Sequence, residues 1–171
     1  MSEEQSHQPQ GTNLAGTAEI MRVTVEVLRH GSPVEIIEVE CDAEPTHQLL
    51  AERIAEALTL GVEELVEEFS SDHGIYDRSR RRCKLKLECI DVHFESESAV
   101  HHFPSRAKWK HVHFWACKKF KIAKDVSVNL ELRDGSPEGP ALNESKHIGR
   151  FEGCRTVWLV KPGPEPNGCR E

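Results

Sequence analysis

Histidine and cysteine are the residue types in this chain that are best suited to binding a metal. Ten histidines and six cysteines are present, and one group lies close together along the chain: His93, His101, His102, His111, His113 and Cys117. In the helix expected there, His111 and His113 point about 200° away from each other, whereas His113 and Cys117 share a face. A structural zinc site needs four converging ligands. We therefore interpret the group as polar surface and predict no bound metal and no cofactor.

The spacing of the cysteines excludes two common motifs. The six stand at positions 41, 83, 89, 117, 154 and 169, and no two are separated by only two residues. This excludes a zinc ribbon and a thioredoxin-type redox pair. The first 16 residues are rich in serine, glutamine and glycine and contain no apolar stretch typical of an export signal. The sequence therefore predicts a cytoplasmic protein with reduced thiols and no disulfide.

A run of basic residues is the next candidate for chemistry: Arg78, Arg80, Arg81, Arg82 and Lys84. Such runs can contact nucleic acid, but the net charge of the whole chain is −7. We interpret the run as a solvated linker and predict no nucleic-acid binding. No apolar run is long enough to span a membrane. No catalytic triad, phosphate loop or carboxylate pair is recognisable, so we predict that the chain is not an enzyme.

The last ten residues, 162–171, combine three prolines with two glycines and one cysteine. Proline fixes φ and has no N–H donor, which keeps this segment out of helices and ladders and favours an extended form. Gly168 lacks a side chain, so its carbonyl can enter a narrow site that a larger residue would obstruct. The pattern predicts a flexible tail with its chemistry at Gly168. Gly163 is the alternative position, and an ordinary frayed terminus is the alternative interpretation.

Hydrophobic periodicity predicts a disordered leader over 1–20 and a small domain over 21–89. Two strands joined near Gly31 form a hairpin, since valines alternate with polar residues on both sides of the turn. A helix follows, with an apolar face that ends at Gly61: Leu50, Ile54, Ala57 and Leu58. The pattern over 62–84 does not distinguish helix from strand, so the third and fourth strands of this domain stay unassigned.

A change of phase marks the expected boundary between two domains. Two apolar series meet there: Leu85, Leu87 and Cys89, then Ile90, Val92 and Phe94. Because alternate residues of a strand face opposite sides, the one-residue slip exchanges the buried face. We interpret it as the point near Cys89–Ile90 where the chain passes from one core to another. A β-bulge within a single strand is the alternative.

The second expected domain, over 90–161, repeats the order of the first. A strand at 90–94, a turn and a return strand lead into a helix with one apolar face: Trp109, Val112, Ala116 and Phe120. Alternating apolar residues then predict a strand from Val126 to Leu132 and a last strand from Val157 to Val160.

The order hairpin, helix, strand, polar excursion, last strand and exposed tail resembles ubiquitin. The pieces VSVNLELRDG, LNESKHIGRF and TVWLVKPG look like its last three segments. Two such units within 21–168 resemble tandem ubiquitin-like modifiers, above all those of bacterial antiphage conjugation (BIL-type) operons. The chain departs from ubiquitin in lacking a terminal Gly-Gly and in carrying prolines in its tail. The resemblance implies an α+β fold of two tandem β-grasp domains followed by a processed tail.

The resemblance also implies a function and partners. A JAB-type protease would cut between Gly168 and Cys169. An E1-like enzyme would then activate the new carboxylate of Gly168, and an E2-like enzyme would pass it to an amine of a target protein, with cysteines of these partners as nucleophiles. Partners would bind the outer sheet face, where Trp158 is the best candidate because its neighbours along the strand have the opposite phase. A non-conjugated β-grasp interaction module and a small metal-binding protein are the competing hypotheses.

Overall fold

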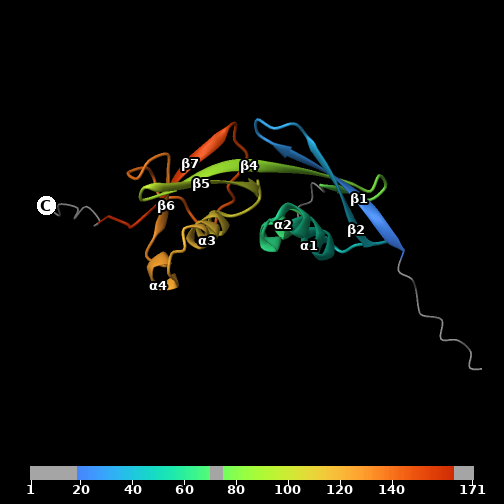
Figure 1. Cartoon of the computed structure of the whole chain (residues 1–171), viewed down its shortest axis with the longest axis horizontal. Helices are drawn as coiled ribbons and strands as arrows, with labels where there is room; N and C mark the ends of the chain where they lie inside the picture. The colour runs from blue at the N-terminus through green and yellow to red at the C-terminus, as the bar shows by residue number, and fades with distance from the viewer. Residues whose placement is uncertain (1–18, 70–74, 164–171) are drawn as a thin grey trace, which may run out of the picture.

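The first half of the chain forms a hairpin, two helices and the start of a long strand. The computed structural model describes residues 19–69 and 75–163. Its first elements are β1 (Ile20–Arg29), β2 (Glu35–Asp42), α1 (His47–Leu58), α2 (Val62–Phe69), β3 (Tyr76–Asp77) and β4 (Arg82–Phe94) (Figure 1). Strands β1 and β2 pair antiparallel around a turn in which Gly31 has a φ of +71°, a value that suits a residue without Cβ. The hairpin and the helix predicted after it are both present.

The ends of helix α1 follow from local capping. The hydroxyl of Thr46 accepts a hydrogen bond from the backbone N–H of Leu49 at 3.1 Å, which satisfies one donor of the first turn. The helix ends at Leu58, and Thr59 adopts a left-handed conformation with a φ of +55°. The expected stop at Gly61 is therefore wrong by two residues. Helix α2 begins directly after Gly61, in the segment that the sequence left unassigned.

The second half begins with the same long strand and repeats the order hairpin, helix, strands. Its further elements are β5 (Glu97–Pro104), α3 (Trp109–Lys119), α4 (Lys124–Ser127), β6 (Glu131–Asp134) and β7 (Cys154–Val160). Strand β5 pairs antiparallel with β4. Strand β7 pairs parallel with β4 on one side and antiparallel with β6 on the other. The described residues thus form one mixed sheet with the strand order β2-β1-β4-β7-β6. Strands β3 and β5 belong to the same sheet, and each of them pairs with β4.

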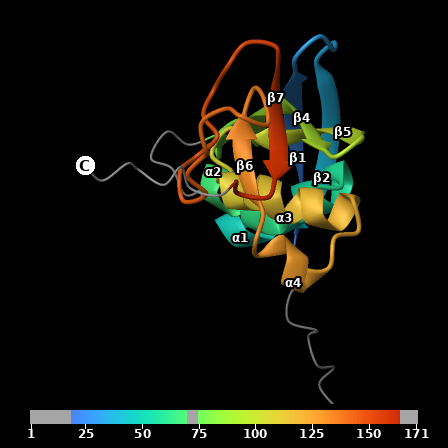
Figure 2. The same ribbon diagram turned by 90° about the vertical axis from the view of Figure 1, so that its left-hand side faces the viewer.

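Strand β4 belongs to both halves of the molecule. Its first residues pair with β1 up to Leu87, and its last residues pair with β5 and β7. Figure 1 shows β4 running through the whole length of the sheet, with α1 and α2 below one end and α3 below the other. Figure 2 gives the same arrangement from the side, with the helices below the strands.

The buried side chains form two hydrophobic clusters, one in each half. From β4, the first cluster takes Cys83, Leu85 and Leu87, and the second takes Ile90 and Val92. The register between β4 and β5 is continuous from Leu87 to Phe94, so no bulge causes the change of phase. Leu87 and Ile90 are three residues apart and so face opposite sides of the strand, while Figure 1 shows the helices of both halves below the sheet. The right-handed twist of a long strand changes the direction of its faces along its length.

The two halves are also joined by a buried carboxylate. Glu68 of α2 is 5% exposed, and its Oε1 accepts hydrogen bonds from the Ser105 hydroxyl, at 3.1 Å, and from the backbone N–H of Arg106. Hydrogen bonds to a charged acceptor are stronger than neutral ones. Helix α2 is therefore fixed to the connection between β5 and α3.

The strand predicted from Val126 to Leu132 is wrong over most of its length. The chain forms the short helix α4 there, and only the end of the predicted segment joins β6. Val126 and Val128 are 39% and 72% exposed, although their alternation imitates a buried strand. Strand β7 pairs with β6 only from Glu131 onward, so the preceding backbone has no strand partner and satisfies its hydrogen bonds locally.

The prediction of no disulfide is also wrong. Cys89 of β4 and Cys154 of β7 are direct partners in the parallel register, with their Cα atoms 4.5 Å apart, and their sulfur atoms are bonded. The two cysteines are 65 positions apart in the sequence, so no local spacing could reveal the pair. Cys41, Cys83 and Cys117 are buried free thiols. None of the helices in the described part is long and apolar enough to cross a lipid bilayer.

Candidate protein-interaction sites

Trp158 lies on the outer face of the sheet in the second half. Its neighbours in β7, Val157 and Leu159, are buried in the second cluster, while Trp158 is half-buried on the opposite face. The alternation of residues along this strand in the sequence therefore predicts correctly that Trp158 lies on the outer face. The indole stacks on the imidazole of His93 from β4, with ring centroids 4.7 Å apart and an angle of 24° between the planes.

Charged groups surround this aromatic pair. The Nε2 of His93 lies 3.0 Å from Oδ2 of Asp91, which orients the ring. On the other side, Arg133 of β6 is the direct partner of Trp158 in the sheet, and its guanidinium donates to Glu131 and to the carbonyl oxygen of Gly139. Tryptophan and arginine are among the residues enriched at protein interfaces, so Trp158 and Arg133 make this face a candidate interaction surface. The sequence analysis named His93 only as part of the histidine group and did not single out Arg133. Only strand pairing brings the two residues to Trp158.

The segment that leads to the predicted processing site begins directly after β7. Lys161, Pro162 and Gly163 are exposed, and a Cβ added to Gly163 would meet nothing within 4 Å. Gly168 and Cys169, the predicted conjugation and cleavage residues, lie outside the described residues.

The histidines singled out in the sequence bind protein groups rather than one another. His113 contacts the carbonyl oxygen of Ser127 at 3.0 Å and the carboxylate of Glu144. His101 stacks on Trp115 at 4.8 Å, and burial lowers the pKa of its imidazole to about 4, which keeps the ring neutral. Within residues 19–69 and 75–163, no three potential ligands gather in a geometry that could hold a metal ion.

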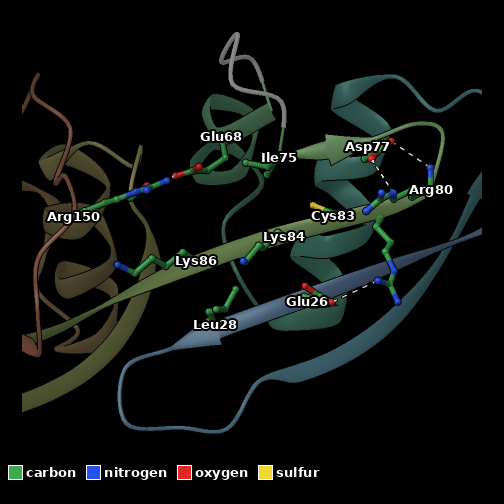
Figure 3. A pocket seen from close by; sticks show the side chains of 12 residues that line it. Glu26, Leu28, Glu68, Ile75, Asp77, Arg80, Cys83, Lys84, Lys86 and Arg150 are labelled. Carbon is green, nitrogen blue, oxygen red and sulfur yellow. Dashed lines mark hydrogen bonds and ion pairs between the residues drawn. The ribbon is translucent and has the colours of Figure 1, made fainter.

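The basic run does not form a linker. Only its first part lies in a turn, and from Arg82 onward the residues belong to β4. Arg82, Lys84 and Lys86 alternate with the buried residues of β4, so they share the face that points away from the first cluster. They line an open cavity of about 690 Å³ at the junction of the two halves (Figure 3). The sequence interpretation as a solvated linker is therefore corrected.

A second cavity, of about 360 Å³, lies between α2 and α3. Phe114 and Trp115 line it from α3, and Glu64 lines it from α2. Glu64 is 7% exposed and accepts a hydrogen bond from the backbone N–H of Gly61. Its Oε2 is buried and has no hydrogen-bond partner among the described residues. This desolvation raises the pKa of the Glu64 carboxyl from 4.5 to about 7.

The raised pKa predicts that Glu64 makes the protein less stable as the pH rises. Between about pH 4.5 and pH 7 the unfolded chain has lost this proton, while the folded chain retains it. The folded state therefore loses roughly 3 kcal/mol relative to the unfolded state over this range. Urea titrations of wild type and Glu64→Gln at pH 4, 5, 6 and 7 measure the difference. We expect the variant to gain stability relative to wild type with rising pH.

The matched control for this prediction is Glu44→Gln, which neutralises an exposed carboxylate. It should follow the wild-type pH profile. Parallel profiles for wild type and Glu64→Gln would contradict a raised pKa.

No protein-family model matches the chain, and no curated protein matches it. Solved structures with similar folds include Caldiarchaeum subterraneum ubiquitin, at 12% identity and a TM-score of 0.37, which covers 46% of this chain and 98% of its own. The C-terminal ubiquitin-like domain of mouse tubulin-specific chaperone e, at 13% identity and a TM-score of 0.31, covers 47% of this chain and 93% of its own. Each of these neighbours therefore aligns with less than half of the chain.

Proposed function

We propose that this chain is a ubiquitin-like protein modifier made of two tandem β-grasp units that share strand β4. One observation supports this above all: β4, β5, α3, β6 and β7 follow each other as hairpin, helix and two strands, with β7 parallel beside β4. This is the order that the resemblance to ubiquitin implies. The first unit would cover 21–89 and the second 90–161, and the chain leaves β7 through exposed residues.

The proposed reaction uses the tail and needs no catalytic group from this chain. A JAB-type protease hydrolyses the peptide bond between Gly168 and Cys169 and releases a tripeptide. An E1-like enzyme then transfers AMP from ATP to the Gly168 carboxylate, with release of pyrophosphate, and its cysteine displaces AMP to form a thioester. The acyl group moves to a cysteine of an E2-like enzyme and finally to a target amine, which forms an isopeptide bond. We place this pathway in the bacterial cytoplasm, in defence against phage.

The test follows the tail in cells that contain the activating, conjugating and processing enzymes. The protein is tagged at its N-terminus, and adducts are detected by immunoblotting and mass spectrometry. We expect Gly168→Glu to lose all adducts, because a side chain next to the carboxylate obstructs adenylation and transfer. A chain that ends at Gly168 should form adducts without the protease.

Two controls locate the reactive terminus. Gly163→Glu places the same side chain five residues earlier and should retain its adducts if Gly168 is the terminus. A mature protein whose mass still includes residues 169–171, or adducts that survive Gly168→Glu, would refute the assignment to Gly168.

The alternative proposal is a β-grasp interaction module that is never conjugated. The observation that favours it is the outer face with Trp158 stacked on His93, which needs no tail to bind a partner. The two proposals differ in the same experiment. If the chain is a binding module, the wild type forms no adducts, and Gly168→Glu binds the partner as well as the wild type does. Trp158→Ala, in contrast, should lose binding of the partner.

A further inference from the structure

The cavity along β4 is lined by positive charges from both halves of the chain. Figure 3 shows Lys84 and Lys86 reaching into it from β4, while Arg150, from the connection between β6 and β7, extends toward it from the opposite side. Arg80 lies at its other end, and Arg82 also lines the cavity. A volume of about 690 Å³ falls in the range typical of ligand sites.

Most carboxylates of this cavity are already engaged by the protein. Glu68 accepts hydrogen bonds from Ser105 and Arg106, and Oδ1 of Asp77 accepts from the backbone N–H of Ser79 at 2.9 Å. Glu26 lies 4.0 Å from Arg82, at the limit of an ion pair.

Two cationic side chains of the cavity, Lys84 and Arg150, form no ion pair among the described residues. In the described part of the chain, no carboxylate lies within ion-pair distance of the Lys84 ammonium or the Arg150 guanidinium, and both residues are exposed. Lys86 has Glu88 as a neighbour at 3.4 Å. Five cationic side chains and three carboxylates line the cavity, and Arg150 points toward the carboxylate of Glu68 (Figure 3). The cavity therefore has a net positive charge on a chain whose net charge is −7, and this excess attracts a negatively charged group.

The spacing of these charges fits an extended chain. Arg82, Lys84 and Lys86 lie two residues apart on one face of a strand, about 7 Å between successive side chains. An extended peptide laid along β4 repeats its own side chains at the same interval. Leu28, the direct partner of Lys86 on β1, also lines the cavity and offers an apolar contact beside the charges.

We propose that this cavity binds an extended acidic segment of a partner protein, with carboxylates at alternate positions facing Arg82, Lys84 and Lys86. A nucleic-acid backbone fits less well. None of the described residues that line the cavity is aromatic, so the bases of a single strand find no stacking surface.

Fluorescence anisotropy of the full-length, unprocessed protein tests this site. The probe is a labelled decapeptide that alternates glutamate and leucine. We expect saturable, salt-sensitive binding that weakens at least tenfold in the double variant Lys84→Met/Lys86→Met, which removes two charges but keeps the aliphatic stems. The control, Lys121→Met/Lys124→Met, removes two exposed charges elsewhere and should bind like wild type. Circular dichroism verifies that both variants are folded.

Three kinds of outcome would overturn the proposal. The first is that the wild type does not bind the alternating decapeptide, or that the two double variants bind it equally well. The second is equal affinity for a decapeptide of five glutamates followed by five leucines, which has the same composition without the alternation. The third is tighter, Lys84-dependent binding of a single-stranded DNA oligonucleotide, which would assign the site to nucleic acid. Because the probe binds without processing of the tail, these results do not depend on whether Gly168 is conjugated.

Discussion

Replacing Leu85 by alanine is expected to lower the free energy of unfolding by about 2–5 kcal/mol, because the substitution leaves a cavity in a close-packed core. Leu85 is fully buried in the first cluster. It lies on β4, the strand whose backbone hydrogen bonds hold both halves of the sheet. We therefore expect the second half to lose its stability together with the first, in a single cooperative transition.

The aromatic residues of the chain allow this to be measured. All three tryptophans, Trp109, Trp115 and Trp158, lie in the second half, so their fluorescence reports chiefly on that half, although Trp115 also lines the cavity between α2 and α3. Far-ultraviolet circular dichroism reports both halves. In Leu85→Ala the two signals should shift to the same lower denaturant concentration.

An exposed position serves as the control for Leu85. Ile36 of β2 is 63% exposed, and Ile36→Ala should leave the transition nearly unchanged. If the fluorescence midpoint of Leu85→Ala stayed at the wild-type value while circular dichroism showed a separate earlier transition, the two units would be independent despite their shared strand.

Removing the bond between Cys89 and Cys154 is expected to cost about 2–4 kcal/mol of stability. The disulfide closes a loop with a sequence separation of 65 residues. A cross-link of that span restricts the unfolded chain strongly. Urea unfolding of the oxidised protein with and without a reductant measures the difference, and Cys154→Ser should behave like the reduced protein.

The response to reductant should disappear in Cys154→Ser, which is the internal control. Cys41, Cys83 and Cys117 are buried free thiols, so a reductant leaves them unchanged. Identical unfolding curves for the oxidised and reduced wild type would contradict the predicted contribution. Because a reducing cytoplasm opposes such bonds, the disulfide also bears on the proposed location, and the thiol state of Cys154 in cells tests that proposal.

Patterns confined to single elements could be predicted from the sequence. The alternating valines of β1, the apolar faces of α1 and α3, and the outward position of Trp158 all follow from periods of two and 3.6 residues. The change of phase at Cys89–Ile90 is visible for the same reason, since each half of β4 follows the period of its own cluster. Such periods record which face of an element is buried, and they depend only on near neighbours in the chain.

The features that depend on partners far away in the sequence could not be predicted in this way. Val126 and Val128 alternate like a strand, yet no strand lies beside them, and only the tertiary structure decides that they form α4 and its end. The disulfide, the stack of His93 on Trp158 and the convergence of Lys84 with Arg150 all arise from the pairing and connection of strands. By itself, the sequence determined the first hairpin, the helices α1 and α3, the last strand and the buried faces of these elements. The tertiary structure decided which surfaces meet, because strand pairing joins residues whose distance along the chain leaves no periodic signal.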